Sequence, residues 1–279
     1  MKSLFLAAAA AALIAPAGPA VSQSVLSSPV LSYADLADLG AGAPVVAHLR
    51  VRDADALDPR EAANVAAGYR RFLIEAEVVA LIRGTGGIGG RVRYLVDLPN
   101  DSRGRPARLG RRAEMLVLAN RASNRPDDLR LVAADAQIPY SPEAAEMLRS
   151  IVREASGPDA APRIVGIGRA FHVPGSLAGE SETQFFLQTA DDRPISLTVL
   201  RRPGEQPRWS VALSEIVDDA AAPPAPNTLL WYRLACTLPA GLPPDALSEA
   251  SPDEARAIQA DYRLVLEGLG RCVRTRARR

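Results

Sequence analysis

The sequence predicts a mainly β protein of the α+β class, with an N-terminal OB-like five-stranded barrel, a second antiparallel β domain and a helical C-terminal tail. Residues 72–82 carry apolar side chains at every second position, which is the pattern of a half-buried strand. Two shorter runs, residues 92–98 and 115–119, repeat this alternation after a glycine-rich loop and a polar loop. The length of the first run favours a small barrel, because a long strand can bend and pair on two sides.

Residues 1–22 have the composition of a secretory signal peptide. Lys2 precedes an apolar run over residues 4–14, and small residues at 18–22 offer a cleavage point. The apolar run is too short for a membrane-spanning helix, and no later stretch is long enough. We therefore expect a periplasmic or secreted protein with no membrane span.

Residues 23–157 are predicted to form the barrel domain. Its five strands share the alternation of apolar and polar positions, and they cover residues 45–52, 72–82, 92–98, 115–119 and 129–133. Ser32 is placed to cap a short helix before the first strand. Ser141, with Pro142 at the first helical position, predicts a terminal helix that ends at Gly157. Five strands and a terminal helix fit a barrel of the OB type.

Residues 158–219 are predicted to form an antiparallel β meander. The domain boundary is the proline-rich segment 158–162. The four expected strands follow it, at residues 163–170, 184–189, 195–200 and 208–216. Turn-forming residues at 191–194 and 203–206 connect neighbouring strands, which favours the meander.

Residues 227–279 are predicted to form a disulfide-tied helical tail that packs on the second domain. Residues 229–235 fit either a helix capped by Asn227 or a strand. Ser251 begins a capping box for the last helix, because Glu stands three positions later. The basic end, residues 271–279, is expected to be frayed.

Cys236 and Cys272 are the only two cysteines, and we expect them to form a disulfide. A simple helical hairpin would place them far apart. Residues 239–250 must therefore double back, or Cys236 must lie on a strand. A link of this length spans up to about 40 Å, so doubling back is feasible.

Residues 84–89 match the dinucleotide-binding pattern GxGxxG, but their context predicts no cofactor site. The fingerprint needs a helix whose N-terminus faces the pyrophosphate. Residues 91–98 instead alternate with the period of a strand. The glycines are therefore expected to form a hairpin loop, and we expect no cofactor.

The two histidines complete no catalytic or metal site in the sequence. His48 falls on the polar face of its strand and is expected to face solvent, and His172 is expected in a loop. The sequence contains neither an HExxH pattern nor two cysteines at the spacing of zinc ligands, so we expect no metal. The segment around Ser181 departs from a nucleophile elbow at its last residue. Glu180 and Glu182, beside a strand, are expected to be solvated.

The polar loop after residue 96 is the candidate binding site. Its charged and amide side chains are Asp97, Asn100, Asp101, Arg103 and Arg105. They suit an unknown protein partner or a small anionic ligand. A net charge of +1 and an aromatic content of 5% argue against nucleic acid.

Three segments of the N-terminal half carry a family resemblance. They are Ala43-Pro44-Val45-Val46, the long strand at 72–83 that ends in Arg-Gly, and Met115-Leu116-Val117-Leu118. With them, residues 43–133 resemble exported OB-type domains of the netrin and tissue-inhibitor kind, which implies a barrel. The inhibitors address a metalloprotease through an N-terminal cysteine, and no cysteine precedes Cys236 here, so inhibition does not carry over. The whole chain also resembles uncharacterised exported proteobacterial proteins, a family that implies no activity.

The expected function is that of an exported, non-enzymatic binding or structural protein of unknown ligand. An export signal without a complete catalytic constellation points to it. The alternative is a periplasmic hydrolase that uses His172 as base and Ser181 as nucleophile.

Overall fold

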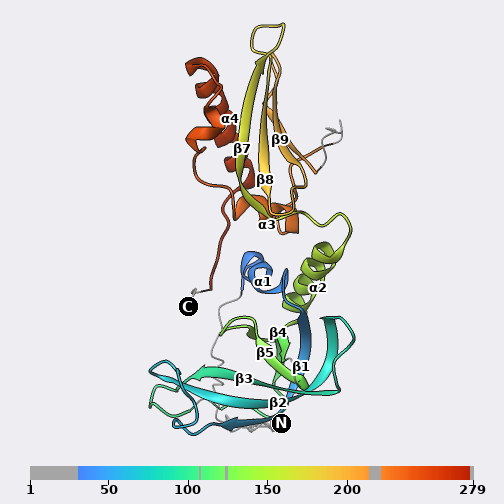
Figure 1. The fold of residues 1–279 in the computed structure, drawn as a ribbon, viewed down its shortest axis with the longest axis vertical. Helices are drawn as coiled ribbons and strands as arrows, with labels where there is room; N and C mark the ends of the chain where they lie inside the picture. The colour runs from blue at the N-terminus through green and yellow to red at the C-terminus, as the bar shows by residue number, and fades with distance from the viewer. Residues whose placement is uncertain (1–30, 107, 123–124, 214–220, 277–279) are drawn as a thin grey trace, which may run out of the picture.

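The structure is a computed structural model that describes residues 31–106, 108–122, 125–213 and 221–276. It is mainly β: a closed five-stranded barrel and a second, antiparallel four-stranded sheet, with helices between them and beside the second sheet (Figure 1). The predicted fold class is confirmed. The predicted signal peptide, residues 1–22, lies outside the described residues. Within the described residues, no helix has the length and apolar character needed to cross a membrane.

The first domain contains eight elements, which are α1 (Tyr33–Gly40), β1 (Val45–Ala56), β2 (Tyr69–Gly84), β3 (Arg91–Pro99), β4 (Glu114–Ala122), β5 (Arg125–Leu131), β6 (Gln137–Pro139) and α2 (Pro142–Ser156). The barrel order is β1-β2-β3-β5-β4, and pairing of β4 with β1 closes it. Strand β5 runs parallel to β3 and antiparallel to β4. Register shifts between β1 and β2 let the 16-residue β2 curl around the barrel. The three-residue β6 was not predicted, because it is too short to show alternation.

Alternation in β1 separates the barrel interior from a second packed surface. Val45, Ala47 and Leu49 point into the barrel, whose core also holds Tyr94. Val46 points outward, yet it is fully buried, because helices cover that side of the barrel. The outward side of β1 is therefore covered at Val46, whereas Arg52 farther along the strand is exposed.

The expectation that His48 faces solvent is wrong. It is 7% exposed and stacks on the ring of Tyr140, with ring centroids 3.9 Å apart. Its Nε2 atom lies 3.0 Å from Oε2 of Glu114 on β4. Tyr140 follows β6, the strand that the sequence did not reveal, so the cover over His48 was not foreseen.

The second sheet consists of β7 (Ile164–Pro174), β8 (Ser181–Thr189), β9 (Ile195–Arg201) and β10 (Arg208–Ala212), in the order β10-β9-β8-β7. The predicted meander is therefore present. Strand β7 continues beyond the predicted end, which places His172 on a strand instead of in a loop. Helix α4 (Pro252–Leu269) lies along one face of the sheet, where Tyr262 contacts Phe185 with ring centroids 5.6 Å apart (Figure 1).

Residues 229–235, for which the sequence allowed a helix or a strand, form a helix, α3 (Leu229–Ala235). Its N-cap is Thr228, whose hydroxyl accepts a hydrogen bond from the backbone of Trp231. The expected cap Asn227 instead has a positive φ of 59°. The chain then doubles back through a 3-10 helix, η1 (Pro244–Leu247), to the start of α4, as the position of the cysteines required.

The Cys236–Cys272 disulfide is confirmed, with the two Cα atoms 5.1 Å apart. Cys236 is the C-cap of α3, and Cys272 follows α4 by three residues. The bond therefore joins the ends of the two helices. The indole nitrogen of Trp231 in α3 supports the same junction by donating to the carbonyl of Leu269, at 2.8 Å.

The outer side of the barrel and the second sheet share one hydrophobic cluster. It contains Val46 and Leu118 from the outside of the barrel, Leu36 from α1, Leu148 from α2 and Trp231 from α3, and it continues into the second sheet. Helices α1 and α2 thus lie between the barrel and the second sheet (Figure 1).

Arg83, at the end of β2, joins the barrel to both of these helices. It donates hydrogen bonds to the carbonyls of Gly40, Ala41, Ala43 and Val152 and to the hydroxyl of Ser156. The last carbonyls of a helix have no partner within the helix. One guanidinium therefore satisfies groups at the ends of α1 and α2 together.

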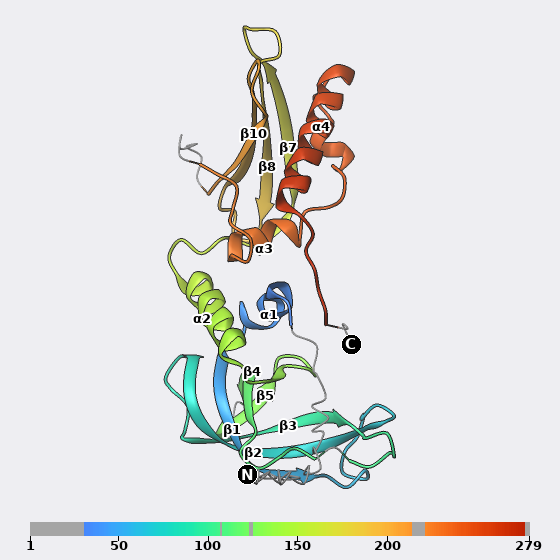
Figure 2. The same cartoon turned by 180° about the vertical axis from the view of Figure 1, so that it is seen from behind.

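The basic end of the chain is not frayed in its described part. Residues 271–276, which we call the C-terminal strap, run from α4 past α3 to α1 (Figure 2). Arg274 pairs with Asp38 of α1 at 2.8 Å, and Arg276 pairs with Asp135 at 2.8 Å. The expectation of a free tail is therefore wrong for residues 274–276, because carboxylates far away in the sequence bind them.

Candidate functional site

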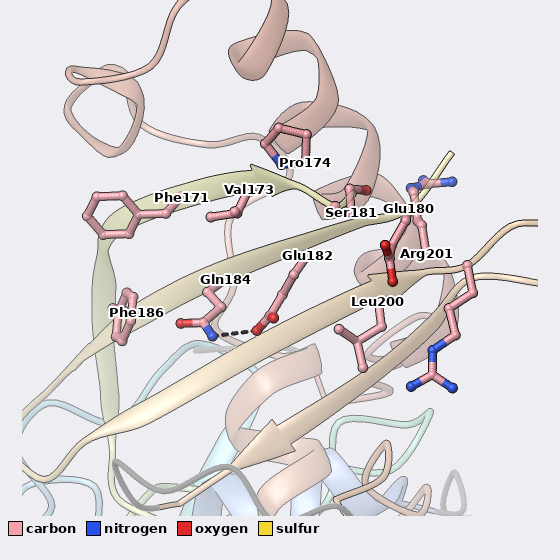
Figure 3. A pocket seen from close by; sticks show the side chains of 12 residues that line it. Phe171, Val173, Pro174, Glu180, Ser181, Glu182, Gln184, Phe186, Leu200 and Arg201 are labelled. Atoms are coloured by element: carbon pink, nitrogen blue, oxygen red, sulfur yellow. Dashed lines mark hydrogen bonds between the residues drawn. The ribbon is translucent and has the colours of Figure 1, made fainter. Parts of the chain in front are cut away.

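The candidate site is a groove on the face of the second sheet that lies opposite α4 (Figure 3). Strand β8 shows how it arises. Thr183 and Phe185 point toward α4 and are buried, whereas Glu182, Gln184 and Phe186 point the other way. Side chains of β7, β8 and β9 enclose a volume of about 450 Å³.

Apolar side chains form one end of the groove. Phe171 is 40% exposed and Phe186 is 43% exposed, and their rings meet edge to face with centroids 6.0 Å apart. Val173 and Leu200 extend this apolar surface along β7 and across to β9. Contiguous exposed apolar side chains on a sheet face are typical of a surface that binds another molecule.

Carboxylates line the other end. Oε1 of Glu182 accepts a hydrogen bond from the amide of Gln184 at 2.6 Å (Figure 3). Oε2 of Glu180 lies 3.4 Å from the backbone nitrogen of Leu177. Within the described residues, neither carboxylate forms an ion pair. Arg201 and Arg202 line the same groove, and Arg201 is already paired with Asp261. A basic group entering the groove would therefore meet the two carboxylates beside the guanidinium of Arg202.

A buried polar network lies beneath the groove and holds α4 against the sheet. Asp261 of α4 is 1% exposed, and its Oδ1 accepts two hydrogen bonds from Arg201, at 2.8 and 2.5 Å. Its Oδ2 accepts a hydrogen bond from the hydroxyl of Thr183 at 2.5 Å. Thr183 has only that one hydroxyl proton, so Nδ1 of His172, 2.8 Å away, must be the donor in their hydrogen bond.

The structure does not bring the two hydrolase candidates together. His172 lies opposite Thr183 in the sheet, whereas Ser181 lies opposite Pro174 and lines the groove. No hydrogen bond connects His172 with Ser181, both of which lie in the described part. A nucleophile and its base need such contact, so this geometry gives the hydrolase alternative no support.

Most of the charged groups predicted for the polar loop are already paired, and Asp97 lies on β3, before the loop begins. Asp97 accepts two hydrogen bonds from Arg71, at 2.7 and 2.8 Å. Asp101 accepts hydrogen bonds from the backbone of Arg103 and from the backbone and side chain of Arg105. The hydrogen bonds from the Arg105 backbone and side chain hold the pKa of Asp101 below its usual value.

The remaining two predicted residues are Asn100 and Arg103, and Oδ1 of Asn100 is buried without a hydrogen-bond partner among the described residues. The backbone nitrogen of Asn100 donates to the carbonyl of Gly68 at 2.8 Å. The side chain of Arg103 is exposed. The binding role of Asp97, Asn100, Asp101, Arg103 and Arg105 stays a prediction.

The glycine-rich loop joins β2 directly to its antiparallel neighbour β3. The predicted hairpin is therefore confirmed, and Arg121 donates a hydrogen bond to the carbonyl of Gly87 in it. Among the described residues, no group of three or more His, Cys, Asp or Glu side chains is placed to hold a metal ion.

The groove was not predicted from the sequence, although strand β8 contains a signal for it. Residues 185–187 are Phe-Phe-Leu, so both faces of β8 carry apolar side chains. A strand with one solvated face should alternate, and a departure from alternation indicates that both faces are covered. Phe185 has its cover in α4, and Phe186 does not.

Comparison of the sequence with known proteins found no matching family model and no match among curated proteins. The function is therefore inferred from the groove and its surroundings.

Proposed function

We propose that this protein is a non-catalytic binding protein that acts outside the cytoplasm, and that the outer face of its second sheet holds a protein segment with apolar side chains next to a basic residue. The observation that carries the proposal is the asymmetry of this sheet. One face is packed under α4, while the other leaves Phe171 and Phe186 about two-fifths exposed. Burying such side chains in a complex gains hydrophobic free energy.

The shape of the outer face favours an extended partner over a compact ligand. A second hollow of about 630 Å³ adjoins the groove, and the two share Glu182, Leu200 and Arg202. Together they cross the sheet from β7 to β10. A partner segment that lies along the two hollows contacts the apolar side chains at one end of the groove. It contacts the carboxylates of Glu180 and Glu182 at the other end.

The groove is tested by panning a random-peptide display library on the protein. We expect the enriched peptides to combine apolar residues with Lys or Arg. Replacing Phe186 by Ser should lower the affinity of the protein for these peptides by about tenfold or more, because an aromatic anchor is removed without disturbing the core. Glu182→Lys should remove the preference for a basic residue.

The control is Leu95→Ser, which replaces a similarly exposed apolar side chain on the barrel. Its peptide affinities should equal those of the unaltered protein. Enriched peptides that bind Phe186→Ser as tightly as the unaltered protein would sink the proposal, as would a panning that enriches nothing.

Export is supported by the formed disulfide, because such bonds persist in oxidising compartments. Expressed in a Gram-negative host, the full sequence should reach the periplasmic fraction with Cys236 and Cys272 oxidised. Deleting residues 1–22 should leave the protein in the cytoplasm with free thiols. Fractionation followed by thiol labelling measures both, and a full-length chain retained in the cytoplasm contradicts the export proposal.

A further inference from the structure

A second binding arrangement lies at α1, apart from the groove on the second sheet. Three carboxylates, those of Asp35, Asp38 and Asp135, form what we call the acidic notch. The C-terminal strap, whose backbone reaches α1 in Figure 2, forms hydrogen bonds with all three carboxylates. Asp35 and Asp38 come from α1, and Asp135 comes from the turn before β6.

The strap is bound in the way that proteins bind a basic peptide. Arg274 donates to both carboxylate oxygens of Asp38, at 2.8 and 3.2 Å, and Arg276 donates to both oxygens of Asp135, at 2.8 Å each. Planar, two-pronged pairing of this kind selects arginine over lysine. The two arginines are separated by one residue, so the notch recognises an Arg-x-Arg spacing.

The middle residue is held through its backbone as well as its side chain. Asp35 accepts hydrogen bonds from the nitrogen and hydroxyl of Thr275, at 2.9 and 2.6 Å, and from the nitrogen of Arg276, at 3.2 Å. Burial by itself raises the pKa of Asp35, but the hydrogen bonds from Thr275 and then from Ser32 outweigh it and lower the pKa to about 2. With the strap in place Asp35 is therefore ionised, and the strap supplies the donors that keep it so.

The strap contributes contacts to the notch without entering the core. No residue in 271–276 is fully buried, and none belongs to the shared hydrophobic cluster. Removing it from the notch would leave α1 and its apolar contacts in place. From these contacts we infer that the acidic notch is a binding site for an arginine-rich protein segment with Arg-x-Arg spacing, and that the strap is its resident intramolecular ligand.

The disulfide gives the strap an advantage over any external segment. Cys272 is fixed to the end of α3, two residues before Arg274, so the strap stays close to the notch. A short tether of this kind corresponds to an effective concentration on the order of millimolar. An external partner must therefore add contacts of its own to displace the strap, and displacement releases the strap from α1 while α3 keeps its apolar contacts.

The test uses full-length chains and a fluorescent synthetic peptide with the sequence of residues 271–279, carrying Cys272→Ser. In the double variant Arg274→Ser and Arg276→Ser, the notch loses its resident arginines and should bind the peptide. The unaltered chain should bind it about 100-fold more weakly, because the strap competes. Fluorescence anisotropy measures both affinities.

Three further arms make the result specific. The single variant Arg276→Ser should give an intermediate affinity, which keeps the test valid if the double variant folds poorly. Adding Asp38→Asn and Asp135→Asn to the double variant should abolish binding. The control Arg263→Ser with Arg60→Ser removes two exposed arginines outside the strap whose side chains form no hydrogen bond or ion pair in the described structure, and it should behave as the unaltered chain does.

Two outcomes overturn the inference. One is equal binding of the peptide by the unaltered chain and by folded Arg274→Ser and Arg276→Ser chains, including the absence of binding by both. The other is equal binding of a peptide with the same composition in scrambled order, which would show attraction to charge alone.

Discussion

Replacing Asp261 by alanine is expected to lower the free energy of unfolding by about 3–5 kcal/mol. This carboxylate is buried in α4 and accepts hydrogen bonds from Arg201 and Thr183. Its removal leaves a partly buried guanidinium and a buried hydroxyl without their acceptor. Such unpaired groups cost more than the pair itself contributes. Urea denaturation followed by circular dichroism measures the change.

The matched control is Glu267→Ala on the same helix, where the side chain is exposed. It should change the free energy of unfolding by less than about 0.5 kcal/mol. Adding Arg201→Met to Asp261→Ala should recover part of the loss, because the unpaired charge is then removed as well. A cost below about 1 kcal/mol for Asp261→Ala would show that α4 is held by apolar packing alone.

Replacing both Cys236 and Cys272 by serine is expected to cost about 4 kcal/mol in the chain-entropy model. The bond closes a segment with a sequence separation of 36, so its loss enlarges the unfolded ensemble. Both cysteines are only partly buried, and serine should leave no large cavity. Guanidinium chloride denaturation measures the difference.

Reduction of the unaltered protein supplies the control for the cysteine variant. A phosphine reductant should lower the denaturation midpoint of the unaltered chain to that of the double-serine chain, and it should leave the double-serine chain unchanged. Midpoints that coincide for oxidised, reduced and double-serine chains would contradict the expected role of the bond.

Local patterns were sufficient to predict the elements. Alternation at 72–82 identified the central strand of the barrel, and the capping residues Ser32, Ser141 and Ser251 marked the starts of three helices. These signals act between residues a few positions apart, so they are visible in the sequence. The disulfide could also be predicted, because only one pairing of two cysteines exists.

Contacts between distant residues were not predictable in the same way. Arg274 and Asp38 are separated by 236 positions, and nothing near either residue specifies the other. His48 lay on a polar face by alternation, but Tyr140 covers it only after β4 and β6 pair. The groove likewise depends on which face of β8 receives α4, which is a property of the assembled sheet.

The contacts of Arg83 have a consequence for how the molecule tolerates change. A single side chain at the end of β2 binds the C-terminal ends of α1 and α2 together, and both helices contribute to the hydrophobic cluster between the barrel and the second sheet. The positions of α1 and α2 between the barrel and the second sheet thus depend on a residue of β2. Insertions in the exposed loops at the far end of the barrel leave this junction untouched, whereas a shift of β2 by one residue would misalign both helices at once.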